Sequence, residues 1–187
     1  MTGTDKIEIA LSKSKLIKNL LGSLVFVIAG IWILIYQPET SNGLFNNPVL
    51  KYGAATGAVM LGGLGVIYFL KKLIDKRPGL VIDDNGVIDN ASAVAAGFIP
   101  WSDIHHIETA RVMRQEFLMF IVKNPNDYLA GQTNMLKRKS MEMNFKHYGS
   151  PITISSHALK CDLAELKSIL SKKLLESKAI SSERKIK

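Results

Sequence analysis

Cysteine is nearly absent from this sequence of 187 residues, which contains only Cys161. One cysteine excludes a disulfide within the chain, so the sequence carries no mark of an oxidising compartment. A nucleophilic role would need a partner base, and His157, four residues earlier, is close to Cys161 only if both lie on one helix. We therefore expect Cys161 to be a small buried or half-buried residue at the start of a helix.

Catalytic and metal-binding motifs are missing as well. The chain has no G-x-S-x-G, H-E-x-x-H, paired C-x-x-C or Walker lysine loop. The glycine-rich stretch 62–65 lies inside an apolar run, which indicates helix packing rather than a phosphate loop. His105 and His106 are adjacent, and adjacent residues of a strand point to opposite faces, which argues against a shared metal ion. We predict no enzymatic activity, no cofactor and no metal site.

Charge is almost absent from residues 19–70, where only Glu39 and Lys51 are charged. The uncharged runs 19–38 and 52–70 would form helices roughly 28–30 Å long, close to the hydrocarbon thickness of a bilayer. Two buried helices of a soluble protein are the alternative, but the rest of the chain would not readily cover helices that are apolar on all faces. A cleaved signal peptide is the competing interpretation of the first run. We predict two transmembrane helices, at 19–38 and 52–70.

The basic residues beside these runs predict the orientation, because Lys and Arg resist translocation. The N-terminal flank has four basic residues, namely Lys6, Lys13, Lys15 and Lys18. The connecting loop has one, Lys51. The exit flank has four, namely Lys71, Lys72, Lys76 and Arg77. Both termini are therefore expected in the cytoplasm. Residues 1–18 form the cytoplasmic N-terminal segment, with a short strand at 6–9, and residues 39–51 form an external loop.

The net charge of +8 is unevenly distributed. Residues 1–77 contain nine Lys/Arg against four Asp/Glu, residues 78–177 contain eleven of each, and residues 178–187 contain four against one. The basic excess thus lies beside the apolar runs and in a short basic tail at 178–187. This distribution fits a membrane surface and argues against nucleic-acid binding.

The second apolar run is rich in small residues. Gly53 and Gly57 form a GxxxG step, and Ala54, Ala58 and Gly62 form a ridge at four-residue spacing. Such ridges let helix backbones approach closely. The partner is either the first span of the same chain, which we favour, or a second copy in a homodimer. Neither span has an ionisable residue at its centre, which argues against a transporter.

Beyond Pro78 the pattern becomes that of an α+β domain over residues 79–177. Asn85-Gly86 between apolar runs predicts a β-hairpin. The apolar stretches 97–112 and 116–124 complete four antiparallel strands, followed by helical pieces near 125–129 and 135–145 and a short strand within 149–156. A final helix is expected over 161–177. Its apolar residues lie on one face: Leu163, Leu166, Ile169, Leu170 and Leu174. Its lysines lie elsewhere: Lys167, Lys172 and Lys173.

Two segments of this domain, residues 85–87 and 97–104, resemble a known protein family. Asn85-Gly86-Val87, followed by Gly97 to Ile104 with the pattern I-P-W-x-x-I, resembles the bacterial pleckstrin-homology-like membrane proteins with two spans. The resemblance implies a bent antiparallel sheet closed by a C-terminal helix, with Trp101 and Ile104 in its core and no catalytic chemistry. Head-group binding by pleckstrin-homology domains uses basic residues around the first hairpin. Here that hairpin is acidic, with Asp83, Asp84 and Asp89.

The resulting expectation is a bacterial inner-membrane protein that contacts lipid through two spans and presents a binding or assembly module to the cytoplasm. An accessory subunit of a larger membrane complex is the alternative, and a membrane-bound enzyme comes third. The basic cluster within the domain consists of Lys137, Arg138 and Lys139. It is either a solvated helix face or a contact for anionic lipid or an acidic partner.

Overall fold

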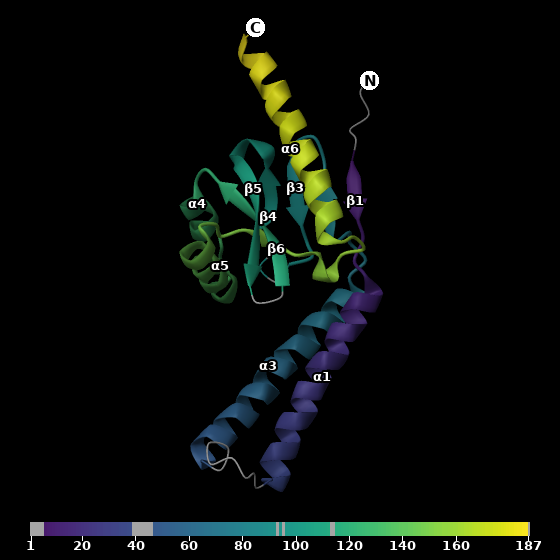
Figure 1. Cartoon of the computed structure of the whole chain (residues 1–187), viewed down its shortest axis with the longest axis vertical. Helices are drawn as coiled ribbons and strands as arrows, with labels where there is room; N and C mark the ends of the chain where they lie inside the picture. Colours follow the sequence, from purple (N-terminus) through teal and green to yellow (C-terminus); the bar gives the residue numbers. More distant parts are fainter. Residues whose placement is uncertain (1–5, 39–46, 93, 95, 113–114, 187) are drawn as a thin grey trace. The chain divides into compact units, whose positions relative to one another are not determined.

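The computed structural model describes residues 6–38, 47–92, 94, 96–112 and 115–186. The chain divides into two compact units (Figure 1). One consists of Met1–Ser12 together with Arg77–Lys187, and the other of Lys13–Lys76. The second unit is therefore an insertion within the sequence of the first.

The inserted unit is a helical hairpin of α1 (Lys13–Tyr36) and α3 (Pro48–Ile74), which lie side by side (Figure 1). Helix α1 ends where Gln37 adopts a positive φ of 47°. Helix α3 begins where the Asn47 side chain accepts a hydrogen bond from the Val49 amide, with proline in the first turn. Both helices are longer than the predicted runs 19–38 and 52–70.

The loop predicted at 39–51 is correspondingly shorter than expected. Residues 48–51 belong to α3, because Asn47 and Pro48 together start the helix four residues earlier than the apolar pattern alone indicates. The first part of that loop, residues 39–46, lies outside the described residues.

The first sheet has four antiparallel strands in the order β1-β2-β3-β4. These strands are β1 (Ile7–Ile9), β2 (Leu80–Ile82), β3 (Gly86–Asp89) and β4 (Gly97–Pro100). The predicted hairpin joins β2 to β3, and its turn is closed by the Asp83 carboxylate, which accepts from the amides of Asn85 and Gly86 at 2.8 and 3.0 Å. The short strand expected at 6–9 is present as β1.

The second sheet has three antiparallel strands in the order β5-β6-β7: β5 (Ile104–Val112), β6 (Gln115–Val122) and β7 (Thr153–Ile154). Two helices, α4 (Pro125–Ala130) and α5 (Met135–Tyr148), lie between β6 and β7 in the sequence. Two short 3-10 turns, η1 (Trp101–Asp103) and η2 (Ser156–Ala158), precede β5 and the last helix. That helix, α6, spans Leu163–Ile186. The predicted α+β class, antiparallel strands followed by a C-terminal helix, is confirmed.

Two predicted boundaries are wrong. The stretch 97–112 is not one strand, because η1 turns the chain between β4 and β5, so residues 80–122 form five strands rather than four. The basic tail expected at 178–187 is not a separate segment, because α6 continues without a break to Ile186. No proline or glycine interrupts this stretch, and lysine, serine and glutamate are tolerated in an exposed helix end.

The core of the domain is formed by both sheets and by one face of α6. Buried side chains come from β2 to β4, from β6 and β7, and from α6: Leu80, Ile82, Val87, Ile99; Leu118, Phe120, Ile154; Leu166, Leu170, Leu174. The predicted apolar face of the last helix is thus buried at its central positions. Lys173, predicted to lie away from that face, is instead buried and only 8% exposed.

Candidate functional site

The helical hairpin is held by close backbone contact at two glycines. A Cβ placed on Gly30 would lie 2.7 Å from the carbonyl oxygen of Ala55, and one on Gly62 would lie 2.8 Å from that of Ser23. Side chains do not tolerate such approaches, so glycine at these positions permits the observed packing. Gly62 is therefore a helix-packing residue within one chain.

The GxxxG step lies on another face of α3. A Cβ on Gly53 or Gly57 would meet no atom within 4 Å, whereas Ala55 and Gly62 are buried. Ala58 is half-buried beside the contact face. The expectation that Gly53 and Gly57 pack against the first span is wrong, because the contact follows the seven-residue step from Ala55 to Gly62 rather than the four-residue step.

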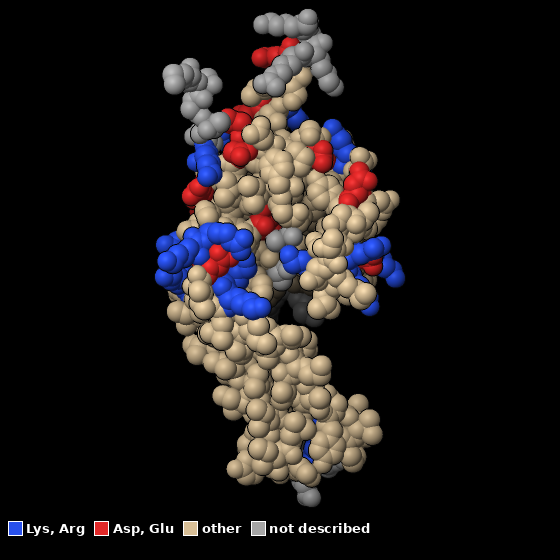
Figure 2. All heavy atoms as spheres, turned by 180° about the vertical axis from the view of Figure 1, so that it is seen from behind, with Lys and Arg blue, Asp and Glu red and all other residues tan. Residues whose placement is uncertain are grey.

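The outer faces of the hairpin are apolar and uncovered. Ten large side chains of the two helices are at least 61% exposed: Val25, Phe26, Ile28, Ile35, Tyr36, Val49, Met60, Leu61, Leu64 and Ile74. Figure 2 shows the helix pair almost entirely free of charge, with Lys and Arg gathered at one end. Both helices are long and apolar enough to cross a membrane, and little of either is buried. The core helices of a soluble protein would be mostly buried.

Both ends of the hairpin connect to the same sheet. Strand β1 ends four residues before α1 begins, β2 begins six residues after α3 ends, and the two strands pair with each other. Ile7 lies opposite Ile82, and Ile9 lies opposite Leu80. The chain thus enters and leaves the hairpin from neighbouring strands.

The two expected core residues, Trp101 and Ile104, are both buried. The Trp101 indole N–H donates to the Asp83 carbonyl at 2.8 Å, and its backbone amide donates to the Asn85 carbonyl at 3.1 Å. Trp101 therefore ties η1 to the β2–β3 turn, and Ile104 starts β5 opposite Val122. These contacts define a structural role for both residues.

A tyrosine–carboxylate pair, which the sequence does not indicate, joins α4 to the end of η1. The Tyr128 hydroxyl donates to Asp103 at 2.9 Å. Burial, followed by this hydrogen bond and the nearby negative charge, raises the pKa of Tyr128 well above its ordinary value. The phenol is therefore held neutral and serves as a hydrogen-bond donor.

The predicted basic cluster lies in the first turns of α5. Asn134 caps this helix by accepting from the Lys137 amide at 3.1 Å. Lys137 is half-buried, Lys139 is exposed, and Arg138 pairs with Glu142 at 3.0 Å. Two apolar neighbours that no pattern in the sequence marks, Met135 and Leu136, are 73% and 76% exposed. The start of α5 thus combines uncovered apolar side chains with cations, a composition suited to an anionic interface.

The side chains of His105 and His106 do not point to opposite faces of the strand, as alternation along a regular strand predicts. A register shift lies between Ile104 and His106, which leaves His105 outside the ladder and brings the two imidazole rings to 5.2 Å between centroids. His106 contacts Glu108 at 2.7 Å. Within the described part of the chain, no group of three His, Cys, Asp or Glu side chains is placed to hold a metal ion.

Cys161 is buried just before α6, whereas His157 belongs to η2. The two residues do not share a helix, so the spacing of four carries no catalytic meaning here.

Comparisons with protein-family models, with curated proteins and with solved structures found no match.

Proposed function

We propose that this chain is an integral protein of the bacterial inner membrane that presents a pleckstrin-homology-like binding or assembly module to the cytoplasm. In this proposal α1 and α3 are transmembrane helices, lipids surround their exposed apolar faces, and the domain binds a partner without catalysing a reaction.

The pairing of β1 with β2 is the observation that carries the proposal. Since these strands belong to one sheet and flank the hairpin in sequence, the hairpin must begin and end on one side of the membrane. Basic residues flank that shared side: Lys13, Lys15 and Lys18 at α1, and Lys71, Lys72 and Lys76 at α3. The positive-inside rule assigns this side to the cytoplasm.

The architecture of the domain supports the pleckstrin-homology-like assignment. The resemblance implies antiparallel strands closed by a C-terminal helix, and the domain has a four-stranded and a three-stranded antiparallel sheet followed by α6. The first strand comes from before the membrane hairpin, so the membrane segment is inserted within the domain.

The start of α5 is the surface that we propose contacts anionic lipid or an acidic partner. Each basic residue near an anionic surface contributes on the order of 1 kcal/mol, and salt screens this attraction. Lys137, Arg138 and Lys139 therefore give a weak, salt-sensitive contact, which the exposed Met135 and Leu136 extend by entering the interface.

An environment-sensitive fluorophore on Leu136→Cys, in a Cys161→Ala background, tests this contact in the full chain reconstituted in bilayers. Its emission should shift to shorter wavelength in anionic bilayers at low salt, and less in neutral bilayers or at high salt. Replacing Lys137, Arg138 and Lys139 by Gln should abolish the shift. Replacing the exposed Lys160, Lys167 and Lys172 by Gln removes the same charge elsewhere and should preserve it. Equal loss in both triple variants would contradict the assignment to α5.

An accessory subunit of a larger membrane complex is the second candidate. It is favoured by the outward-facing Gly53 and Gly57, which leave room for another helix to approach α3. Purification in mild detergent separates the two candidates. A membrane partner, or a second copy, retained in fixed stoichiometry and lost in Gly57→Leu supports the subunit role, whereas a chain that purifies alone supports the first proposal.

A further inference from the structure

A groove of about 480 Å³ opens beside α6. One wall is formed by the end of η1 and the start of β5, another by the last turns of α6, and Lys123 follows β6 at its edge. The lining residues are Trp101, Ser102, Ile104, His105, Lys123, Ser177, Lys178, Ser181 and Ser182. All of them belong to the domain, and none belongs to the basic cluster of α5.

The charged residues that line this groove are all positive. Two ammonium groups, Lys123 and Lys178, line it, and no carboxylate does so among the described residues. The nearest acid in sequence, Asp103, accepts hydrogen bonds from Tyr128 and Ser102. Lys178 is held at the wall because its ammonium donates to the His105 carbonyl at 2.6 Å, which leaves its other two protons available.

Hydroxyl groups supply further donors. Ser177, Ser181 and Ser182 come from successive turns of α6, and Ser102 faces them from η1. At present Ser181 donates to the Ser177 carbonyl at 2.9 Å and Ser182 to the Ala179 carbonyl at 2.7 Å. Hydroxyl protons rotate freely, so these groups can turn to a ligand oxygen.

We propose that this groove binds a phosphate group carried on a small organic molecule or on a lipid head group. Phosphate oxygens accept strong charge-assisted hydrogen bonds from ammonium groups and further bonds from hydroxyls, and the groove offers both. Trp101 and Ile104, which are 3% and 1% exposed, form the apolar base of the groove. Because it is hollowed, the groove discriminates between ligands of equal charge, which the exposed start of α5 does not.

Calorimetric titration of the full chain in mild detergent tests the proposal with two soluble probes, inorganic phosphate and glycerol 3-phosphate, at matched ionic strength. We expect saturable binding of glycerol 3-phosphate. Phosphatidic acid retained by the delipidated chain, counted by native mass spectrometry against phosphatidylcholine, distinguishes a lipid head group from a free phosphate ester. Binding in either arm supports the groove, and binding in neither arm overturns it.

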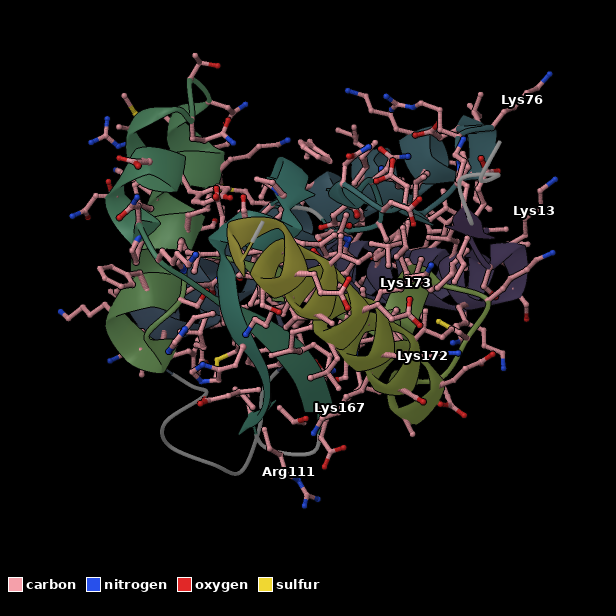
Figure 3. All side chains as sticks on the ribbon, turned by 90° about the horizontal axis from the view of Figure 1, so that it is seen from above. Lys13, Lys76, Arg111, Lys167, Lys172 and Lys173 are labelled. Carbon is pink, nitrogen blue, oxygen red and sulfur yellow. The ribbon has the colours of Figure 1, made fainter. Side chains whose placement is uncertain are left out.

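Variants locate the binding. Lys178→Met and Lys123→Met should each weaken it roughly tenfold or more, because each removes a charge-assisted hydrogen bond. Lys167→Met is the matched control, since Lys167 is an exposed lysine of the same helix that does not line the groove (Figure 3). Ser181→Ala, a smaller change that leaves the helix intact, should weaken binding severalfold. Equal loss with Lys167→Met, or no loss with the groove variants, would contradict the assignment.

The outcome is separable from that of the proposed function. The fluorophore on Leu136→Cys reports contact at the basic cluster of α5, and the groove variants leave that cluster unchanged.

Discussion

The ammonium of Lys173 lies 3.8 Å from the carboxylate of Asp84, which joins the buried face of α6 to the turn between β2 and β3. It also lies 3.5 Å from Glu176 one turn along the helix. Asp84 is half exposed, whereas Lys173 lies among core residues. The carbon stem of this lysine fills space in the core while its charge reaches the partners at the rim.

The stem and the charge of Lys173 can be separated by substitution. Lys173→Met keeps the stem and removes the cost of burying an ammonium, so the free energy of unfolding should change by less than about 1 kcal/mol. Lys173→Ala should lose about 2 kcal/mol through the missing packing. Lys173→Glu should lose more, because it places a third carboxylate near Asp84 and Glu176. Thermal unfolding of the full chain, followed by near-ultraviolet circular dichroism, ranks the variants. A Lys173→Met variant as unstable as Lys173→Glu would show that the ion pair dominates.

Trp101 should behave as a core residue with one specific hydrogen bond. Trp101→Ala should cost roughly 3–5 kcal/mol, the usual loss for a buried aromatic side chain. Trp101→Phe should cost less, because it mainly leaves the Asp83 carbonyl without its indole donor, a loss of about 1–3 kcal/mol. Trp32→Phe, on an exposed face of α1, is the control and should leave the domain unaffected. Unchanged stability in Trp101→Ala would remove Trp101 from the core.

Tyr128 should make stability depend on pH in the alkaline range. Its folded pKa is raised, so the folded state favours the neutral phenol. The stabilisation is complete below the unfolded pKa of about 10 and is lost as pH rises above it toward the folded pKa. Spectroscopic titration should show a step of tyrosine ionisation above the unfolded pKa of about 10, and Tyr128→Phe should remove that late step. Tyr148→Phe should leave it in place. Loss of the late step in Tyr148→Phe alone would contradict the assignment.

The two glycine positions of α3 should differ sharply. Gly62→Leu would push a side chain into the Ser23 carbonyl and separate the helices, whereas Gly57→Leu enters open space. We expect Gly62→Leu to lower the thermal stability of the detergent-solubilised chain and Gly57→Leu to leave it nearly unchanged. The reverse order would mean that the hairpin packs through the GxxxG step.

Local patterns in the sequence were sufficient where one short-range preference dominated. Asn85-Gly86 between apolar runs predicted the β2–β3 hairpin, and the spacing of Leu166, Leu170 and Leu174 predicted the buried face of α6. The alternating residues at 6–9 predicted β1, although its partner β2 lies beyond the whole helical hairpin.

Tertiary geometry decided the features that the sequence did not predict. Lys173 is buried because Asp84, remote in sequence, receives its charge. The register shift that brings His105 beside His106 has no local sequence marker. The GxxxG step of Gly53 and Gly57 marks a face on which another helix can approach closely. Helix α1 instead packs against the neighbouring face of α3 that contains Gly62. The groove beside α6 is lined by residues from three separate segments of the chain, so no short sequence motif predicts it.

Cysteine labelling in cells tests the central claim, a membrane hairpin with both ends in the cytoplasm, most directly. Single cysteines at Asn42→Cys, between the helices, and at Ser168→Cys, exposed on α6, are introduced in a Cys161→Ala background and treated with a membrane-impermeant maleimide. We predict that Asn42→Cys reacts in intact cells with a permeable outer envelope, and that Ser168→Cys reacts only after the inner membrane is opened. Reaction of Ser168→Cys in intact cells, or equal reaction of both positions under both conditions, would contradict the account.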